Sequence, residues 1–522
     1  MNYSGRNENK RHCSIFINFF SLFLLNNNVI IKMFSNSLER HFHSFAKKII
    51  GHKHRISTPY GRKRLYYADW IASGRLYDPI EKRIAQEFGP MLANTHTESS
   101  DTGIFMTQAY HQALENIKRH VNAGEKDAII SFGSGMTAVV NKFQRILGLK
   151  YCGRMTHKEC LAEKERPVVF ITHMEHHSNH TSWLETYADV VVIPPGDDLL
   201  IDLNKVEDTV KSYSDRQLKI GSFTACSNVT GIETPYHAMA EIMHKYGGLC
   251  FVDFAASAPY IDINMHPAKE TQKLDAIFFS PHKFLGGPGT SGILIFDTEL
   301  YHNAVPDNPG GGTVDWTNPW GERKYVDDVE AREDGGTPGF IQAIRTALCV
   351  DLKDKMEPAK IHDREIQMLK KVFNRFDGIK ELNILAHEKR ERLAVLSFYI
   401  DDLHYNLAVR LLNDHFGIQV RGGCACAGTY GHYLLNVSHE DSRAITSKIT
   451  SGDLSEKPGW VRMSLHPTMC DKELDYILDA IEQLTENKAK WAAPYQYNSR
   501  TNEFYHPKMK DFSADINKAL HL

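Results

Sequence analysis

The chain has 522 residues, of which 42% are hydrophobic and 24% are charged, a balance typical of soluble globular proteins with two or three sizeable cores. Its formal net charge of -3 provides no global basic field, which argues against a nucleic-acid-binding protein. The nine cysteines are scattered apart from Cys424 and Cys426, so they form no disulfide framework and suit a reducing compartment.

The first 55 residues are predicted to be an N-terminal extension outside the fold. Basic residues precede an apolar run at 15–25, as in a signal peptide, but no small-residue cleavage site follows. The asparagines at 26–28 end this run before it reaches the roughly 20 residues that a membrane span needs. A targeting segment, a weak anchor and a start at Met33 remain open. We expect a cytoplasmic protein, with a mitochondrial or other organellar location as the alternative.

From about Asp127 onward, short runs of β-branched and aromatic residues alternate with amphipathic stretches. The runs are nearly continuously apolar, which predicts a mostly parallel sheet covered on both faces by crossover helices. Seven strands are expected at 128–132, 168–172, 190–193, 220–225, 249–254, 276–280 and 292–296. The helices expected between them include 137–149, 203–213 and 236–246.

This seven-stranded unit is predicted to be a large domain over residues 56–345. The stretch at 303–318 is rich in Gly, Pro and Asn, which indicates a loop, and a helix-prone segment at 340–376 then leads out of the sheet. A smaller α+β domain is predicted over 346–490, followed by a polar and aromatic tail at 491–522 that shows no clear pattern. The elements expected in the smaller domain are strands at 392–400 and 461–465 and helices at 403–416 and 471–484.

The most informative segment is DAIFFSPHKFLGGPGTSGILIF, residues 275–296. An apolar strand ends in Ser280, Pro281, His282 and Lys283, and a glycine-rich turn and another strand follow. A lysine at the carboxyl end of a buried strand lies where open α/β sheets bind ligands, and its pKa can be lowered enough there for Schiff-base chemistry. Ser280 and His282 can donate hydrogen bonds to a phosphate beside it. The alternative is an ordinary surface lysine.

Two further segments are suited to a phosphorylated ring. Asp253 closes the apolar run at 249–252, where an acid is costly unless it is paired. A protonated pyridine nitrogen, as in pyridoxal phosphate (PLP), would be such a partner, although a helix-capping or turn aspartate is the alternative. Residues 131–143 run from a strand through glycines into a helix, so that N–H groups near Met136 and Thr137 would face an anion.

Histidines are crowded after a predicted strand in THMEHHSNHTSWLE, residues 172–185. A metal site would need several ligands at compatible spacing, and only Glu175 stands nearby as an acid. We therefore favour stacking of His176 on a flat cofactor ring and expect no metal.

Two late segments complete the set of candidates. In VRGGCACAGTYGHYLL, residues 420–435, Cys424 and Cys426 lie in a glycine-rich loop where Arg421 would favour a thiolate. Structural cysteines and a disulfide-prone pair are the alternatives. Arg462 lies within an apolar strand and needs a carboxylate partner, either a structural acid or an amino-acid substrate.

Together, and in this order, these segments resemble the class V aminotransferase family, and they look closest to its cysteine desulfurase and selenocysteine lyase branch. The resemblance covers roughly residues 66–484. Its motifs are the glycine–threonine turn, the double histidine, SNVTG, the strand-end Asp, SPHK, GGTP and RMSLHPT. It implies the type I fold of PLP transferases, with a large and a small domain. It also implies a homodimer, in which Thr337 of GGTP reaches the phosphate of a partner subunit.

The resemblance implies a role for each matching residue. Lys283 would hold PLP as a Schiff base, Asp253 would pair with the pyridine nitrogen, and His176 would stack on the ring. The remaining expected contacts are Met136, Thr137, Ser280 and His282 at the phosphate, Asn228 of SNVTG near the phenolic oxygen, and Arg462 at the substrate carboxylate. Cys426 falls at the nucleophile of the pattern R-x-G-x-x-C-A, which begins at Arg421.

The sequence departs from the desulfurase pattern at two places. Ala256 stands where a glutamine would donate to the phenolic oxygen, unless Ser257 substitutes for it, and Cys424 and Ala425 replace the histidines before the loop cysteine.

Three hypotheses follow. The first is a PLP-dependent lyase that moves sulfur from L-cysteine to Cys426, releases alanine and serves a sulfur acceptor protein. The second keeps the fold but performs transamination, β-elimination or epimerisation on another amino acid, with both cysteines idle. The third is a non-catalytic PLP-fold module that binds a partner in a sulfur relay, and the intact Lys283, Asp253 and Arg462 weigh against it.

Overall fold

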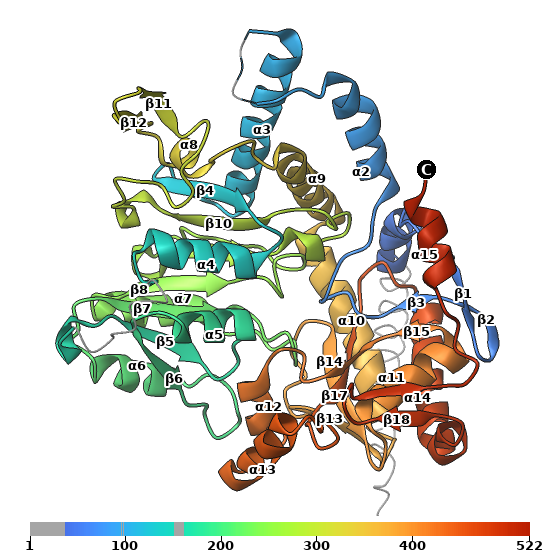
Figure 1. Ribbon diagram of the computed structural model, residues 1–522. Coiled ribbons are helices and arrows are strands. Elements are labelled where there is room, and N and C mark those ends of the chain that lie inside the picture. The colour runs from blue at the N-terminus through green and yellow to red at the C-terminus, as the bar shows by residue number, and fades with distance from the viewer. Residues whose placement is uncertain (1–36, 96, 98, 151–160) are drawn as a thin grey trace, which may run out of the picture.

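The computed structural model describes residues 37–95, 97, 99–150 and 161–522, and it consists of two lobes (Figure 1). The apolar run at 15–25 lies outside the described residues. The larger lobe is built on a seven-stranded sheet and the smaller lobe on a four-stranded sheet. None of the helices in the described parts of the chain combines the length and the apolar character that a membrane crossing requires.

The seven-stranded sheet has the order β4-β10-β9-β8-β7-β5-β6. Strand β10 is antiparallel to both of its neighbours, whereas β9, β8, β7, β5 and β6 pair in parallel. Its strands are β4 Asp127–Phe132, β5 Val168–Thr172, β6 Asp189–Ile193, β7 Lys219–Thr224, β8 Leu249–Asp253, β9 Ala276–Phe279 and β10 Gly292–Asp297. The predicted α/β class and all seven strands are confirmed, with bounds that differ by one residue or none at each end.

Helices cover both faces of this sheet, which explains why its strands are continuously apolar. Successive residues of a strand point to opposite faces. In β9, Ile277 and Phe279 belong to one core and Phe278 to the other. The first core includes residues of α3 Asp101–His120, α6 Leu203–Lys211 and α7 Tyr236–Lys245, and the second includes residues of α4 Met136–Ile146 and α5 His177–Leu184.

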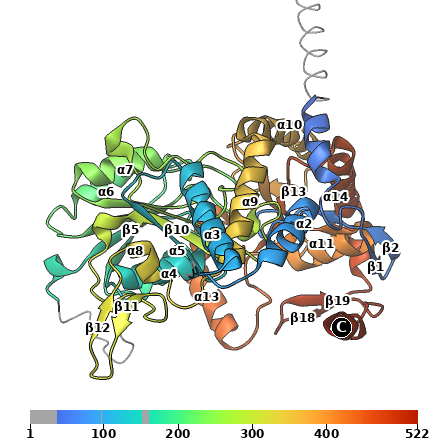
Figure 2. The same cartoon turned by 90° about the horizontal axis from the view of Figure 1, so that it is seen from above.

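Two helices, α9 Phe340–Met356 and α10 Pro358–Phe376, run between the lobes (Figures 1 and 2). The helix-prone segment at 340–376 is therefore two helices. The break falls at Glu357, which adopts a left-handed φ of 62°. Its successor Pro358 disfavours helical geometry in the preceding residue, so the chain turns here.

The small lobe is an antiparallel sheet of order β13-β14-β17-β16. Its strands are β13 Leu382–Ile384, β14 Val395–Ile400, β16 Arg421–Gly423 and β17 Trp460–Ser464, and its main helices are α11 Tyr405–Leu411 and α14 Asp471–Ala492. The N-terminal part of the chain joins this lobe, because β3 Tyr66–Tyr67 pairs with β15 Ile418–Gln419. Phe42 and Ile49 are buried in the first core described above, which also includes residues of this lobe, so the fold begins before residue 56, earlier than expected.

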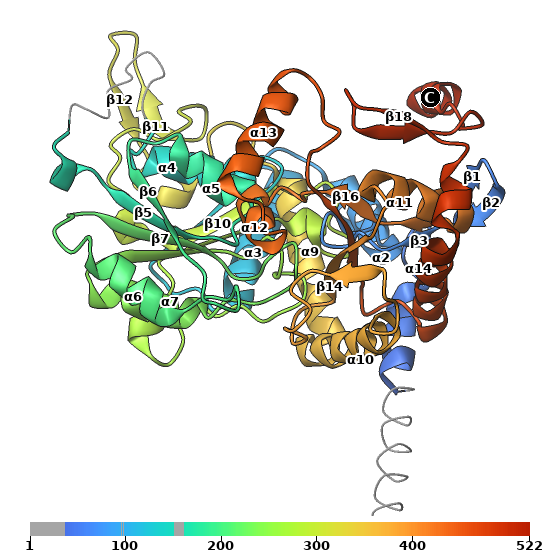
Figure 3. The ribbon, with the colours of Figure 1, turned by 90° about the horizontal axis from the view of Figure 1, so that it is seen from below.

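Several elements were not expected from the sequence. The predicted loop at 303–318 contains part of a hairpin, and the tail forms another hairpin that packs on α11 (Figure 3). Asn502 in that second hairpin donates from Nδ2 to the hydroxyl of Tyr405 at 2.6 Å. The first hairpin consists of β11 Val314–Thr317 and β12 Arg323–Tyr325, and the second of β18 Gln496–Asn498 and β19 Glu503–Tyr505. Besides α3, further unexpected elements include β1 Arg55–Thr58, β2 Gly61–Arg64, α2 Asp78–Arg83, α8 Val329–Glu333, α12 Gly428–Leu434, α13 His439–Thr450 and α15 Ser513–Leu520.

Candidate active site

A cavity of about 220 Å³ lies between the carboxyl ends of the parallel strands and the small lobe. This is the edge at which open α/β sheets bind their ligands. Ten of the eleven predicted site residues line it: Met136, Thr137, His176, Asn228, Asp253, Ser280, His282, Lys283, Cys426 and Arg462. The eleventh, Thr337, is exposed and lies outside this lining, so its predicted role concerns a second copy of the chain.

Lys283 ends the short turn Pro281–Lys283 that follows β9. The turn is held from outside the sheet, because the Gly74 N–H donates to the carbonyl of His282 at 2.9 Å. A Cβ at Gly74 would lie 1.8 Å from the carbonyl oxygen of Phe284, so this contact requires glycine. Burial lowers the pKa of Lys283 to about 8, although the nearby Asp253 opposes that shift. More of the amine is thus uncharged near neutral pH than in an exposed lysine, and the uncharged form is able to attack a carbonyl group.

Asp253 ends β8 with only 3% of its surface exposed. Its Oδ1 accepts from the N–H of Ala255 at 2.8 Å, and within the described residues it has no ion-pair partner. Burial raises its pKa to about 6. A buried carboxyl group of this kind is stabilised by a cation. The protonated pyridine nitrogen of PLP meets that requirement.

His176 lies directly before α5 and caps it, since its Nδ1 accepts from the N–H of Ser178 at 3.1 Å. Burial, followed by the charge of Lys283, lowers its pKa to about 3. The ring is therefore neutral at physiological pH. A neutral imidazole on the cavity wall is suited to stacking on an aromatic ring, the role that the sequence predicts for His176.

Hydroxyl groups and a helix N-terminus gather at one end of the cavity. The Met136 N–H at the start of α4 donates to Ser280 Oγ at 2.8 Å, and Thr137 Oγ1 lies 2.6 Å from Ser178 Oγ. Burial, with a contribution from Lys283, lowers the pKa of His282 to about 4, so its ring is neutral. Neutral donors beside the N-terminus of an 11-residue helix fit a phosphate group.

Arg462 has a carboxylate partner that the sequence did not identify. Its Nη2 lies 3.1 Å from Asp69 Oδ1, while Arg421 Nε lies 3.2 Å from Asp69 Oδ2. Arg462 Nη1 also donates to the carbonyl of Asn228 at 3.2 Å, and its buried Nε has no partner among the described residues. Two guanidinium groups share one acid, so an uncompensated positive charge remains beside the cavity for a substrate carboxylate.

The sequence around Asp69 indicates that this acid needs a partner. It is an acid within the run YYADWI, where Ala68 is fully buried and Trp70 and Ile71 are 3% and 1% exposed. A carboxylate inside such a run is costly unless it is paired, which is the argument that identified Asp253. The other residues that line the cavity without having been predicted include Ser178, Thr224 and Cys226.

The positions that depart from the desulfurase pattern differ in what they contribute. Ala256 lines the cavity, whereas Ser257 is fully buried and does not, so Ser257 does not replace the missing glutamine from the cavity wall. Asn228 donates from Nδ2 to the carbonyl of Ala425 at 2.7 Å, and its buried Oδ1 has no partner among the described residues. The second N–H of this amide is the donor that could face a phenolic oxygen.

The structure separates the two loop cysteines. Cys426 is exposed and lines the cavity, whereas Cys424 is half-buried and packs against an apolar cluster that includes Met174, Val229 and Trp460. Ala425 and Cys426 adopt left-handed φ angles of 51° and 57°. Each such residue costs roughly 1–3 kcal/mol when it is not glycine, so the loop depends on contacts that hold it.

Glu175, the acid considered for a metal site, is used in a different way. It is 1% exposed and accepts hydrogen bonds from Thr172 Oγ1, Asn179 Nδ2 and Thr224 N at 2.7–2.8 Å. Burial raises its pKa to about 8, so it is largely protonated at neutral pH. The described residues contain no group of three or more His, Cys, Asp and Glu side chains arranged to hold a metal ion.

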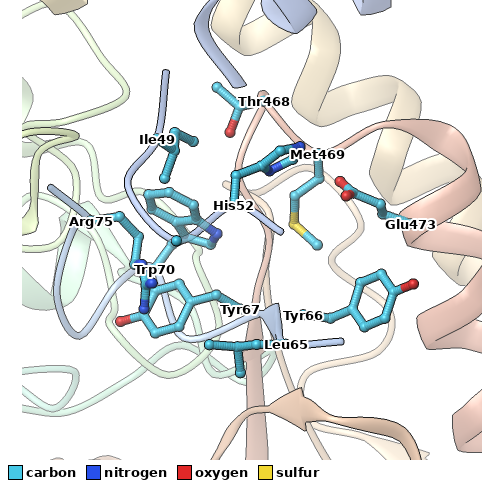
Figure 4. A pocket seen from close by; sticks show the side chains of 11 residues that line it. Ile49, His52, Leu65, Tyr66, Tyr67, Trp70, Arg75, Thr468, Met469 and Glu473 are labelled. Atoms are coloured by element: carbon cyan, nitrogen blue, oxygen red, sulfur yellow. The ribbon is translucent and has the colours of Figure 1, made fainter. Parts of the chain in front are cut away.

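A second, smaller cavity of about 40 Å³ lies between the N-terminal segment and α14 (Figure 4). Aromatic side chains line it, among them Trp70, which stacks on His466 at a centroid distance of 4.0 Å. The buried Nε1 of Trp70 has no partner among the described residues. The space suits ordered water and is too small for a cofactor.

The chain is similar to known proteins over most of its length. Residues 66–477 match the family model described as Aminotransferase class-V. A probable cysteine desulfurase of Halalkalibacterium halodurans is 28% identical over 371 residues, which cover 70% of this chain and 84% of that protein. One from Staphylococcus epidermidis is 28% identical over 393 residues, covering 74% and 89%.

Solved structures share the fold at lower identity. The apo cysteine desulfurase of Thermococcus onnurineus superimposes with a TM-score of 0.67 at 20% identity, covering 85% of this chain and 98% of that one. The cysteine desulfurase CsdA of Escherichia coli gives a TM-score of 0.62 at 19% identity, covering 80% and 94%. The type I fold predicted from the sequence is therefore confirmed.

Proposed function

The chain belongs to the class V aminotransferase family, whose members depend on PLP, and we propose that it is a cysteine desulfurase-like lyase. The observation that carries the proposal is the position of Cys426, an exposed thiol on the wall of the cavity that contains Lys283. The desulfurase names of the curated relatives support it. The substrate would be L-cysteine and the products alanine and a persulfide on Cys426, which a sulfur acceptor protein would then discharge.

Each part of PLP has a residue that fits it. The Lys283 amine would hold the cofactor covalently, Asp253 would face the pyridine nitrogen, and His176 would cover the ring. Hydroxyl groups and the N-terminus of α4 would hold the phosphate. When bound, PLP withdraws electrons from the α-carbon of an attached amino acid, which makes the α-proton labile and lets the β-carbon keep the electron pair of its bond to sulfur when that bond breaks.

The protein's own groups then position the substrate and accept its sulfur. Arg462, with the charge it shares with Arg421, would orient the substrate carboxylate. Lys283, once its amine is free, has a pKa of about 8, suited to moving the α-proton. The Cys426 thiolate attacks the substrate sulfur, an S–S bond forms and the Cβ–S bond breaks. The electron pair of the broken Cβ–S bond stays on the β-carbon, which takes a proton and becomes the methyl group of alanine.

The second hypothesis, another PLP reaction on the same scaffold, is favoured by one observation. Ala256 lines the cavity where the desulfurase pattern has glutamine, so the cavity lacks that amide donor. A β-lyase would release sulfide without using Cys426. The non-catalytic alternative is opposed by the presence of Lys283, Asp253 and Arg462 in one cavity.

The test is to supply the PLP-loaded protein with L-cysteine and a reductant and to quantify all products. We expect alanine and sulfide in equal amounts, because each transferred sulfur leaves one alanine. Sulfide accompanied by pyruvate and ammonia would indicate β-elimination and contradict the proposal. If L-cysteine gives no product, the spectral response to a panel of amino acids would identify the substrate of the second hypothesis.

We further propose that the protein is a homodimer. Thr337 is exposed in the segment Gly335–Gly339 and lies outside its own chain's cavity, which suits a residue that completes the phosphate site of a partner subunit. Light scattering is expected to give twice the chain mass, and Thr337→Ala is expected to weaken PLP retention several-fold while the dimer remains. A monomer that still binds PLP tightly would overturn this proposal.

A further inference from the structure

The loop that carries Cys426 belongs to the small lobe, yet the large lobe holds it by three hydrogen bonds. The N–H of His177 donates to the carbonyl of Cys426 at 2.7 Å. The N–H of Gly428 donates to His177 Nε2 at 2.9 Å, and Asn228 Nδ2 donates to the carbonyl of Ala425 at 2.7 Å. Two of the three bonds involve one residue, His177, through its backbone and its side chain.

These hydrogen bonds are made to the part of the loop whose backbone is strained. Ala425 and Cys426 are the two consecutive residues with left-handed φ angles, and their two carbonyl groups are the ones that accept from the large lobe. A strained conformation persists only where its surroundings enforce it. The contacts from α5 and from Asn228 are surroundings of this kind, and they add to the hydrogen bond within the loop from the Ala427 N–H to the carbonyl of Cys424 at 3.1 Å.

The fit around His177 is close. A Cβ at Gly428 would lie 3.1 Å from His177 Nε2, so glycine allows the imidazole to approach the first residue of α12. One turn along α5, His180 Nδ1 lies 3.3 Å from Thr429 Oγ1, a weaker contact with the same segment. Since His177 Nε2 accepts a hydrogen bond, it carries no proton in this arrangement.

We propose that His177 is a positioning residue that clamps the Cys426 loop over the cavity. The inference rests on the proposed function for its catalytic meaning. His176 and His177 are adjacent, so that the first faces the cofactor site while the second holds the sulfur-accepting loop. One end of α5 thereby fixes the thiol relative to the substrate. Acceptance by Nε2 is the essential property, rather than the bulk of the ring.

The experiment compares His177→Gln with His177→Met. The two side chains have similar length, but only glutamine supplies a strong acceptor. Amide hydrogen exchange over residues 424–429 is measured in the PLP-free protein. We expect exchange about tenfold faster in His177→Met and close to the parent in His177→Gln. His180→Met, which removes the neighbouring imidazole, is the control and is expected to change exchange little.

The PLP-loaded variants give a second measurement. His177→Met is expected to form alanine about tenfold more slowly, with the cofactor spectrum and the KM for L-cysteine unchanged, because Lys283 and Arg462 remain in place. His177→Gln is expected to recover most of the rate. A higher KM for L-cysteine and an altered cofactor spectrum, together with the slower rate, would indicate general damage to the site. That result would overturn the specific role of His177.

Three exchange results would also overturn the proposal: equal exchange in the parent and His177→Met, equal acceleration in His177→Gln and His177→Met, or a Gly428 amide that exchanges in the parent as fast as an unprotected one. The last check needs no variant, so it can contradict the proposal even if a substitution disturbs folding. If the parent forms no alanine from L-cysteine, the proposed function fails, while the exchange comparison still decides whether His177 holds the loop.

Discussion

Lys283→Ala is expected to abolish the yellow colour of the purified protein and to slow alanine formation by more than about 10⁴-fold. The reason is that Lys283 is the lysine on the cavity wall, at a strand end near Asp253, and its lowered pKa of about 8 provides an uncharged amine. The measurements are the visible spectrum, reduction of the PLP link by borohydride and product analysis. Because the amine loses its proton as the pH rises through about 8, capture of PLP by the parent is expected to become faster across that range.

The chain offers a matched control for this variant. Lys353 is 3% exposed, and burial also lowers its pKa to about 8, but it lies outside the cavity and donates to the carbonyl of Ile261. Lys353→Met is expected to keep the colour and the borohydride-reducible link. If Lys283→Ala kept that link, or Lys353→Met lost it in a folded protein, the assignment of Lys283 would be wrong. Lys283 and Lys353 both have a lowered pKa, but only Lys283 lies on the wall of the cavity.

The sheet was predictable because burial on both faces leaves a direct mark on the sequence. Strands β5 and β8 read as unbroken apolar runs, and their residues divide between two cores. The amphipathic α3, which spans 20 residues, was not predicted, because it precedes the first sheet strand and lies outside the alternation of strands and helices that marks the sheet in the sequence. The C-terminal hairpin was missed for another reason. Polar contacts such as that of Asn502 with Tyr405 fix it, and these leave no periodic pattern.

The site was predictable where a residue stands at a strand end, as Lys283 and Asp253 do. It was not predictable where the chemistry depends on segments distant in the sequence. The pairing of Asp69 with Arg462 joins positions 393 residues apart, and the bond between Asn228 and Ala425 joins positions 197 apart. A single sequence shows that such residues need partners, but the partners appear only when the lobes are assembled.

For Cys424 and Cys426, the sequence and the structure give separate reasons to prefer one thiol as the nucleophile. The two thiols lie two residues apart in a flexible-looking glycine-rich loop, and the spacing from Arg421 favoured Cys426 as the nucleophile. The backbone geometry gives an independent reason, since the left-handed residues turn Cys426 to the cavity and leave Cys424 against the apolar cluster. These observations support different roles for the two thiols.

Cys426→Ser is accordingly expected to keep the PLP spectrum and its change on binding L-cysteine, yet to lose sulfide and alanine formation by more than about 10³-fold. A serine hydroxyl stays protonated at neutral pH and does not attack sulfur, while Lys283, Asp253 and Arg462 are untouched. Cys424→Ser is the matched control, since it makes the same substitution two residues away. It is expected to keep the rate within about threefold and to lose about 1–2 kcal/mol of stability, because a hydroxyl enters an apolar cluster.

The pair of variants separates the remaining hypotheses. Equal loss in both would mean that the two thiols act together, as a relay, and that the packing of Cys424 does not exclude it from the chemistry. If both variants released sulfide like the parent, the sulfur would leave without a protein persulfide, as in β-elimination, and pyruvate would replace alanine among the products. Retention in Cys424→Ser with loss in Cys426→Ser would leave Cys426 as the acceptor. Its loop is held by the large lobe through Ala425, Cys426 and Gly428, and its thiol lines the cavity that contains Lys283.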